Sequence, residues 1–270
     1  MENETVHFTR TERVWPERGI DGAALKWIAM CSMLIDHIGA VVLEYGLYYQ
    51  GGAERMKVFL EQPWGVFLYP LSLFLRVLGR PAFLIYCFLL VEGFVHTADR
   101  KRYGRNLLLF GFISEIPFNL AVVNRVFDPM YQNVFFELFI GFLILCWIEQ
   151  AEKMTYGPKE MNLICLYTLI GCGAAILAGA DYNAVGILII VFLYRFRNSR
   201  GKQTAAAGVL GFIETLFPTL GAGALAAVPI WFYNGKRGKQ KMKFLFYWFY
   251  PLHLLALFLI RWYFLGIPLA

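Results

Sequence analysis

The segment around which this chain is organised is residues 21–39, DGAALKWIAMCSMLIDHIG, where a polar N-terminal arm gives way to an apolar helix. Ionisable side chains are costly inside a bilayer, so those found in a spanning helix usually serve a purpose. Lys26 and His37 are eleven residues apart, and at about 100° per residue they return to nearly the same helix face. Their separation along the axis is about 16 Å. We therefore expect one wall with a cation at the membrane surface and an imidazole near mid-bilayer, which suits a long substrate with an anionic head.

The composition is that of a membrane protein. Hydrophobic residues make up 59% of the 270 residues and charged residues only 16%, with a mean hydropathy of +0.53, whereas soluble domains carry about 25% charged residues. No small-residue cleavage site follows the basic residues near the start, so we expect the first apolar segment to be a retained signal anchor. The net charge is +6, and the charged residues lie mainly between the apolar runs. Membrane topology accounts for this distribution better than nucleic-acid binding does.

Neither the cysteines nor the histidines have the spacing of a metal site. The five cysteines all lie in apolar segments, their number is odd, and no CxxC pair occurs. We interpret them as core-packing thiols rather than as a disulfide framework. The histidines lack an HxxxH or HxxE spacing, so we expect no metal.

The apolar runs predict an all-α, polytopic helix bundle. With about 20 residues per crossing, we expect about nine transmembrane helices, near residues 24–48, 79–97, 104–123, 133–149, 161–179, 182–195, 204–217, 219–233 and 244–264. Residues 64–78 are also apolar but are interrupted by Pro70, and we expect a short re-entrant or interfacial helix there.

Basic residues indicate the orientation of these helices. If the N-terminus is cytoplasmic, most of the 25 lysines and arginines fall on the cytoplasmic side, as the positive-inside rule requires. We therefore expect a multi-pass protein of a bacterial cytoplasmic membrane, with a cytoplasmic arm at residues 1–23 and one transmembrane domain at residues 24–270. The oligomeric state is left open.

Two histidines are predicted to meet inside the bundle. His37 lies near the middle of the first span, and His253, beside the helix-kinking Pro251, lies near the middle of the last. A carboxylate beside a histidine can fix its tautomer, and Asp36 is adjacent to His37. Neighbouring helix residues point about 100° apart, however, so Asp36 alternatively serves another helix.

A second polar group marks the cytoplasmic end of the span at residues 79–97. Glu92 and His96 are four residues apart and share a helix face, which predicts either a pair that holds the helix end or a binding site. A basic cluster follows, formed by Arg100, Lys101, Arg102 and Arg105. This cluster is either a topology signal alone or, together with Lys26, a binding site for phosphates.

A third polar group lies around Pro117. This proline removes a backbone donor and kinks the helix, which frees carbonyls that tend to line cavities. Glu115 is predicted at about the depth of His37, and Asn133 and Glu137 open the next span. Each carboxylate is a candidate for chemistry or, alternatively, a structural partner of Arg76 or Arg80.

Several of these stretches together resemble the TraX family of bacterial membrane proteins. The matching residues are Leu25-Lys26, Met33 to Gly39, Gly79-Arg80, Glu92-Gly93-Phe94, Thr97, Tyr103, Ile113 to Phe118, Asn133 to Phe136, and Tyr250 to Leu254. They extend from the first span to the last, and as a set they are specific.

The resemblance implies acetyl transfer. The family's namesake acetylates the N-terminal amine of conjugative pilin, and the family is similar to a wider group of transmembrane acyltransferases that includes heparan-glucosaminide acetyltransferase and the acyltransferase-3 enzymes. That last group has Asp-Gly-x-x-Arg, ten residues and then a histidine. Here Asp21-Gly22 is followed one place later by Lys26, ten residues and His37. Lysine lacks the bidentate geometry of arginine, and Glu137 stands where a small hydroxyl residue is expected.

The resemblance also implies roles for individual residues. It gives a catalytic group of His37, Asp36, Glu115 and His253. For the donor, acetyl-CoA from the cytoplasm, it gives Lys26, Arg80, His96, Arg100, Lys101, Arg102, Tyr103 and Arg105. For the acceptor it gives Glu92, Ser114, Asn133, Glu137 and Tyr250.

In this interpretation His37 deprotonates an acceptor amine, such as a pilin N-terminus, a small amine or an amino sugar. Transfer is direct or passes through an acetyl-histidine intermediate. Three alternatives stay open: O-acetylation of a surface glycan or lipid, a proton-coupled transporter with an intramembrane relay, and a non-catalytic assembly factor.

Overall fold

The computed structural model describes residues 15–16, 18–49, 52–239 and 244–266. Within these ranges the chain is helical, and the β-type pairings are two isolated bridges, Ile20 to Tyr233 and Gln132 to Ala180. The predicted all-α bundle is confirmed. The predicted arm at residues 1–23 lies mostly outside the described residues.

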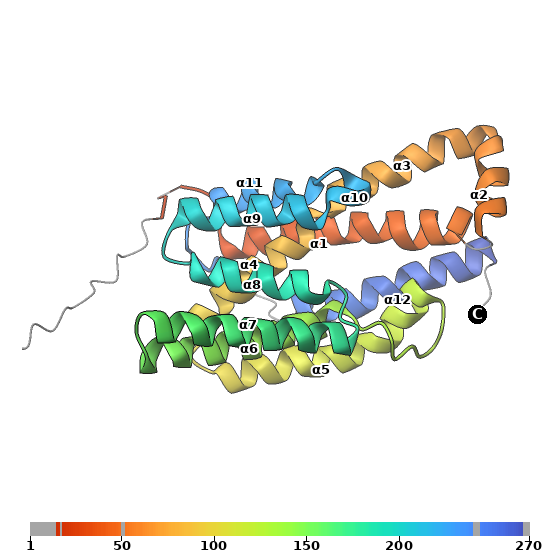
Figure 1. Cartoon of the computed structure of the whole chain (residues 1–270). Helices are drawn as coiled ribbons and strands as arrows, with labels where there is room; N and C mark the ends of the chain where they lie inside the picture. Colours follow the sequence, from red (N-terminus) through yellow and green to blue (C-terminus); the bar gives the residue numbers. More distant parts are fainter. Residues whose placement is uncertain (1–14, 17, 50–51, 240–243, 267–270) are drawn as a thin grey trace, which may run out of the picture.

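Apart from the short α2, which lies across one end, the longer helices run nearly along a common direction, and their connections alternate between the two ends of the bundle (Figure 1). In chain order they are α1 Gly22–His37 continuing into the π-helical η1 Ile38–Tyr49, α2 Gly52–Glu61, α3 Pro63–Gly79, α4 Pro81–His96, α5 Arg100–Phe118 continuing into the π-helical η2 Asn119–Val123, α6 Val134–Met154, α7 Pro158–Ala178, α8 Asn183–Arg195, α9 Arg200–Glu214, α10 Leu216–Thr219, the 3-10 helix η3 Ala222–Ala226, α11 Ala227–Trp231 and α12 Leu245–Leu265. The end with connections 97–99, 155–157, 196–199 and 232–239 is termed the basic end. The end with connections 124–133 and 179–182 is termed the opposite end.

In the part of the chain that the structure describes, six helical stretches are long and apolar enough to cross a bilayer, so the chain is a membrane protein. They are Gly22–Leu47, Pro63–His96, Arg100–Val123, Val134–Met154, Pro158–Ala178 and Leu245–Leu265. The predicted count of nine is not confirmed, because the segments predicted at 182–195, 204–217 and 219–233 form shorter helices. Of these, α8 has 13 residues and α9 has 15, against about 20 for a full crossing.

The helix at residues 63–79 is not the separate re-entrant or interfacial element that its proline predicts. α3 begins beside α2, packs along α1, and is followed after Arg80 by α4, which reaches the basic end (Figure 1). The two together form one bent crossing of 34 residues. Pro81 stands at the first position of α4, where its missing N–H costs nothing, so the bend falls at the junction.

α4 is the central helix of the bundle. Most of its residues are buried, including Phe83, Phe88 and Phe94, and it packs against α1, α6, α8, α9 and η3. Large apolar side chains on the outer helices are exposed instead, among them Phe67, Phe112 and Leu169. In a bilayer these side chains meet lipid, so the polar groups described below are enclosed by apolar layers.

Candidate functional site

His37 and His253 meet in the interior of the bundle. His37 is the last residue of α1 before the π-helical turn, a feature frequent at functional sites, and His253 comes from α12. His37 Nδ1 lies 2.6 Å from His253 Nε2, with the rings within 15° of parallel. The predicted shared histidine site is therefore confirmed in its geometry.

The hydrogen bonds of this pair determine which nitrogens carry protons. His253 Nδ1 lies 2.7 Å from the carbonyl oxygen of Phe249, which can only accept, so this nitrogen is the donor. In a neutral His253 the other nitrogen, Nε2, is then an acceptor, and His37 Nδ1 must donate to it. When both rings are neutral, the chain of bonds leaves His37 Nε2 with an available lone pair.

Of the two arrangements predicted for Asp36, the structure shows the second, in which the carboxylate serves a neighbouring helix rather than His37. Its carboxylate pairs with Arg76 and with Arg80, whose Nη2 lies 3.0 Å from Oδ1. Because adjacent helix residues point about 100° apart, Asp36 faces α3 and α4 while His37 faces α12. Gly79 makes this approach possible: a Cβ at that position would lie 2.1 Å from Asp36 Cβ.

A cavity of ≈40 Å³ lies beside His37. Its walls come from α1, the α3–α4 junction, the start of α6, the 179–182 connection and α12, and they are formed by Met33, Asp36, His37, Gly79, Arg80, Ala82, Phe83, Tyr86, Val134, Asp181, Tyr182 and Tyr250. His37 is part of the wall, whereas His253 contacts His37 from outside it. The volume holds a few water molecules, so two reacting groups require the surrounding helices to move apart.

Two wall residues, Asp181 and Tyr182, were missed by the sequence reasoning. They lie in the short connection between α7 and α8, which reads as a surface turn between two apolar runs. In the folded chain this turn lies in the cavity wall. Conversely, Arg80, expected at the donor phosphates, lies in the cavity wall and is engaged by Asp36. Tyr250, expected near the acceptor, does line the cavity.

The polar residues of α5 and α6 form a separate structural cluster. The Asn133 side chain accepts from Phe135 N as the N-cap of α6 and donates to Gly111 O at 2.8 Å and Glu115 Oε2 at 2.6 Å. Asn119 also donates to Glu115. Glu115 therefore ties α5 to α6 rather than contacting His37 or an arginine, which corrects its predicted catalytic placement.

Ser114 and Glu137 are fully buried but lie outside the cavity wall. The Glu137 carboxylate is packed against Gly186, where a Cβ would lie 2.5 Å from its Oε1. Within the described residues, Glu137 forms no ion pair with Arg76 or Arg80 and does not line the cavity. These two predicted acceptor contacts are not brought to the site.

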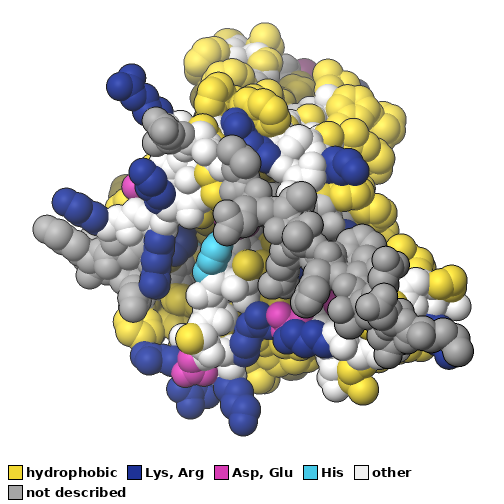
Figure 2. Space-filling view, turned by 90° about the vertical axis from the view of Figure 1, so that its left-hand side faces the viewer, with side chains coloured by type: hydrophobic (Ala, Val, Ile, Leu, Met, Phe, Trp, Pro, Cys, Tyr) yellow, Lys and Arg dark blue, Asp and Glu magenta, His cyan; other side chains and the backbone are white. Residues whose placement is uncertain are grey.

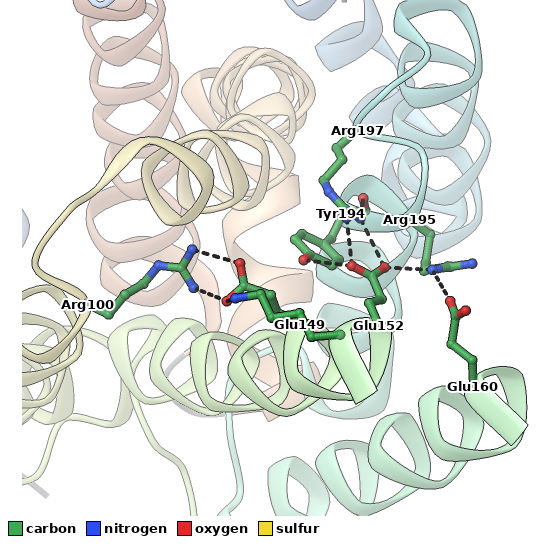
Figure 3. Close-up of polar contacts among 8 residues, drawn as sticks. Arg100, Glu149, Glu152, Glu160, Tyr194, Arg195 and Arg197 are labelled. Atoms are coloured by element: carbon green, nitrogen blue, oxygen red, sulfur yellow. Dashed lines mark hydrogen bonds and ion pairs between the residues drawn. The ribbon is translucent and has the colours of Figure 1, made fainter. Parts of the chain in front are cut away.

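The basic end carries two kinds of cation. Lys and Arg side chains are spread over this face (Figure 2). Some are engaged: Arg100 forms a bidentate pair with Glu149 and lies 3.6 Å from the Phe94 ring centre, while Glu152 accepts from Arg195, Arg197 and Tyr194 (Figure 3). Lys101, Arg102 and Arg105 are exposed and extend from the start of α5.

The remaining predicted residues at this end have mostly structural contacts. His96 and Glu92 form the expected pair at 3.5 Å, with the His96 side chain 63% exposed. The Tyr103 ring packs against Phe142 and above Gly93, where a Cβ would lie 2.8 Å from the Tyr103 hydroxyl. Lys26 points toward α12, with Nζ 5.0 Å from the Phe246 ring centre, so Lys26 and His37 do face the same helix.

These features define a polytopic helical membrane protein with a buried histidine pair between its first and last helices. The family model described as TraX protein matches residues 21–261, and the chain belongs to the TraX family. It is also 28% identical over 265 residues to the probable fimbrial assembly protein FimC, serogroup H1, of Dichelobacter nodosus, covering 89% of this chain and 96% of the relative. No solved structure matches the chain.

Proposed function

We propose that this protein is an integral membrane acetyltransferase that uses acetyl-CoA and modifies an amine of a pilin or fimbrial subunit. Membership of the TraX family and the relative named for fimbrial assembly support this choice of substrate. The observation that carries the proposal is the hydrogen-bond chain from Phe249 O through His253 to His37, beside a buried cavity.

In the proposed reaction His37 acts as general base. Its Nε2 takes a proton from the acceptor nitrogen as the C–N bond to the acetyl carbon forms and the C–S bond of the thioester breaks. The same imidazole then returns a proton to the leaving thiolate. Throughout, His37 Nδ1 donates to His253 Nε2, which holds the ring in place and stabilises the imidazolium, the role of the third group in a catalytic triad.

The donor would be bound from the basic end, which in this proposal faces the cytoplasm as the positive-inside rule predicts. Lys101, Arg102 and Arg105 are exposed and available for its phosphates, whereas Arg100 is held by Glu149. Lys26, with Arg237 close enough for their charges to interact, lies on the α12-facing side of α1. From there the pantetheine arm would follow α1 and α12 for about 16 Å to His37.

The test is incubation of the purified full chain with labelled acetyl-CoA and a panel of amine and hydroxyl acceptors, beside the His37→Ala variant. We expect acetylated amine from the parent protein alone. Full activity in the variant would exclude His37 as the base. A folded parent that supports fimbrial assembly in cells yet transfers no acetyl group would instead indicate a non-catalytic assembly factor.

A further inference from the structure

The cavity contains two carboxylates in different electrostatic situations. Asp36 is neutralised by Arg76 and Arg80. Asp181 accepts a hydrogen bond from the neutral hydroxyl of Tyr131, and no ion pair to it occurs within the described residues; the charges of Arg80 and Arg76 act on it only from a longer distance. Burial raises the pKa of Asp181 above its usual value, because the charged carboxylate is poorly solvated there. A cationic group entering the cavity would relieve this cost.

Asp181 is held rigidly in its position. α7 ends at Gly179, which adopts a left-handed conformation with φ of 66°, and a Cβ there would lie 2.1 Å from the carbonyl oxygen of Met130. Gln132 N donates to Gly179 O at 2.8 Å, and Gln132 also bridges to Ala180. The two connections at the opposite end, 124–133 and 179–182, are thus fastened together with Asp181 facing the cavity.

Four aromatic side chains form much of the remaining wall, beside Arg80 and small or aliphatic residues. Phe83, Tyr86, Tyr182 and Tyr250 line the same cavity, and Tyr182 is stacked on Phe83 with ring centres 3.4 Å apart. Aromatic faces attract ammonium groups, and more strongly where water is excluded. A carboxylate without a direct ion pair, placed among aromatic rings, is a combination suited to a primary ammonium group rather than to a neutral hydroxyl.

We propose that Asp181 binds the ammonium group of the acceptor inside this cavity. This inference rests on the proposed function and adds to it the charge of the acceptor and the residue that recognises it. The bound ammonium releases one proton to solvent to become a neutral amine. His37 then takes the second proton during attack on the thioester, so the overall reaction gives the acetamide, free thiol and one proton.

Binding measured without any donor tests this inference separately from catalysis. The probes are an Ala-Gly-Ala peptide amide with a free N-terminus and the same peptide N-acetylated, each titrated into the full chain in nanodiscs. We expect the free amine to bind and the acetylated form not to bind. Asp181→Asn should weaken amine binding roughly 10- to 100-fold, the loss expected for a buried hydrogen bond between charged groups.

Two variants serve as controls. Asp128→Asn removes a carboxylate of the same region that pairs with Arg125 and lies outside the cavity, and it should bind like the parent. Tyr131→Phe removes the partner of Asp181 but keeps the charge, and it should still prefer the free amine. Equal binding of both peptides by the parent, or an unchanged affinity in folded Asp181→Asn, would overturn the inference. Failure of the proposed function would appear elsewhere, as an absence of acetyl transfer by the parent.

Discussion

His37 Nδ1 and His253 Nε2 lie 2.6 Å apart although 216 residues separate them in the chain. This contact joins the first long helix to the last. It also defines the role of His253: the backbone carbonyl of Phe249 sets the tautomer of His253, and His253 in turn sets that of His37.

This relay predicts different losses for the two histidines. His37→Ala should abolish acetyl transfer, because the general base of the proposed reaction is removed. His253→Ala should leave a residual rate, lowered by up to about 10⁴-fold, the loss found when the group that fixes the tautomer of a catalytic histidine is replaced. Single-turnover rates with labelled acetyl-CoA measure both.

Phe249→Tyr is the matched control for this pair, since the relay uses the backbone carbonyl and the ring stacked on His253 is retained. Its rate should equal that of the parent. Equal losses of rate in His37→Ala and His253→Ala would mean that both histidines act on the substrate directly.

Asp36 is predicted to matter for stability rather than for proton transfer. Asp36→Asn leaves Arg76 and Arg80 with an uncompensated positive charge in a buried position, which should cost about 3–5 kcal/mol. The measurement is the free energy of unfolding in mixed micelles. Asp36→Asn combined with Arg80→Met should recover part of the loss, because it removes the arginine left without its carboxylate, whereas Arg76 still pairs with Glu44 at 3.5 Å. A normal stability accompanied by a shifted pH profile of transfer would show that Asp36 acts through His37 after all.

The sequence could predict the histidine pair because each residue lies near the middle of its apolar run, so depth alone brings them to one level. For Asp36 the sequence could predict only that its side chain points about 100° away from His37. It could not identify Arg76 and Arg80 as the residues that Asp36 contacts. Asp181 could not be predicted, because its place in the cavity depends on how the connection between α7 and α8 packs against the rest of the bundle and not on a local pattern. Because α8 and α9 are shorter than a full crossing, counting apolar runs does not settle the number of crossings either.

Gly79 is predicted to be intolerant of a methyl group. In Gly79→Ala the new Cβ would lie 2.1 Å from Asp36 Cβ and 2.6 Å from its Cα, so α1 and α3 must move apart. Overpacking of this kind costs typically about 1–3 kcal/mol, and transfer should fall with it because the cavity wall shifts.

Gly173→Ala in α7 provides the comparison, because nothing lies within 4 Å of the added Cβ. It should stabilise the helix by up to about 1 kcal/mol. Thermal unfolding of the two variants in nanodiscs should therefore shift in opposite directions, and a matching shift would argue that close packing at Gly79 is unimportant.

At the basic end, replacing the exposed cations and replacing the paired Arg100 should affect KM for acetyl-CoA differently. Replacing Lys101, Arg102 and Arg105 together by Gln should raise KM for acetyl-CoA roughly 10-fold, taking about 0.5 kcal/mol for each exposed charge pair, and should leave stability unchanged. Arg100→Gln should instead lower the Tm, because Glu149 loses its bidentate partner, and should leave KM for acetyl-CoA near normal. A larger change of KM in Arg100→Gln than in the triple variant would instead place the binding site for the acetyl-CoA phosphates near Arg100 and Glu149.

Arg261 fixes the other half of α12 and so supports the histidine pair from a distance. It is fully buried and donates to the carbonyls of Leu120 and Ala121 and to Asn124 Oδ1, which ties α12 to the π-helical end of α5. Arg261→Met should destabilise the protein by at least about 1.5–3 kcal/mol, the value of one hydrogen bond to a charged group.

Arg125→Met is the control, because Arg125 is exposed at the same end and should change stability by no more than about 0.5 kcal/mol. Since Arg261 and His253 lie on the same helix, loss of this anchor lets α12 shift relative to α1 and should slow acetyl transfer even at temperatures where the Arg261→Met protein stays folded. An unaltered rate in folded Arg261→Met would show that α1 and the backbone carbonyl of Phe249 hold the histidine pair without help from the far end of α12.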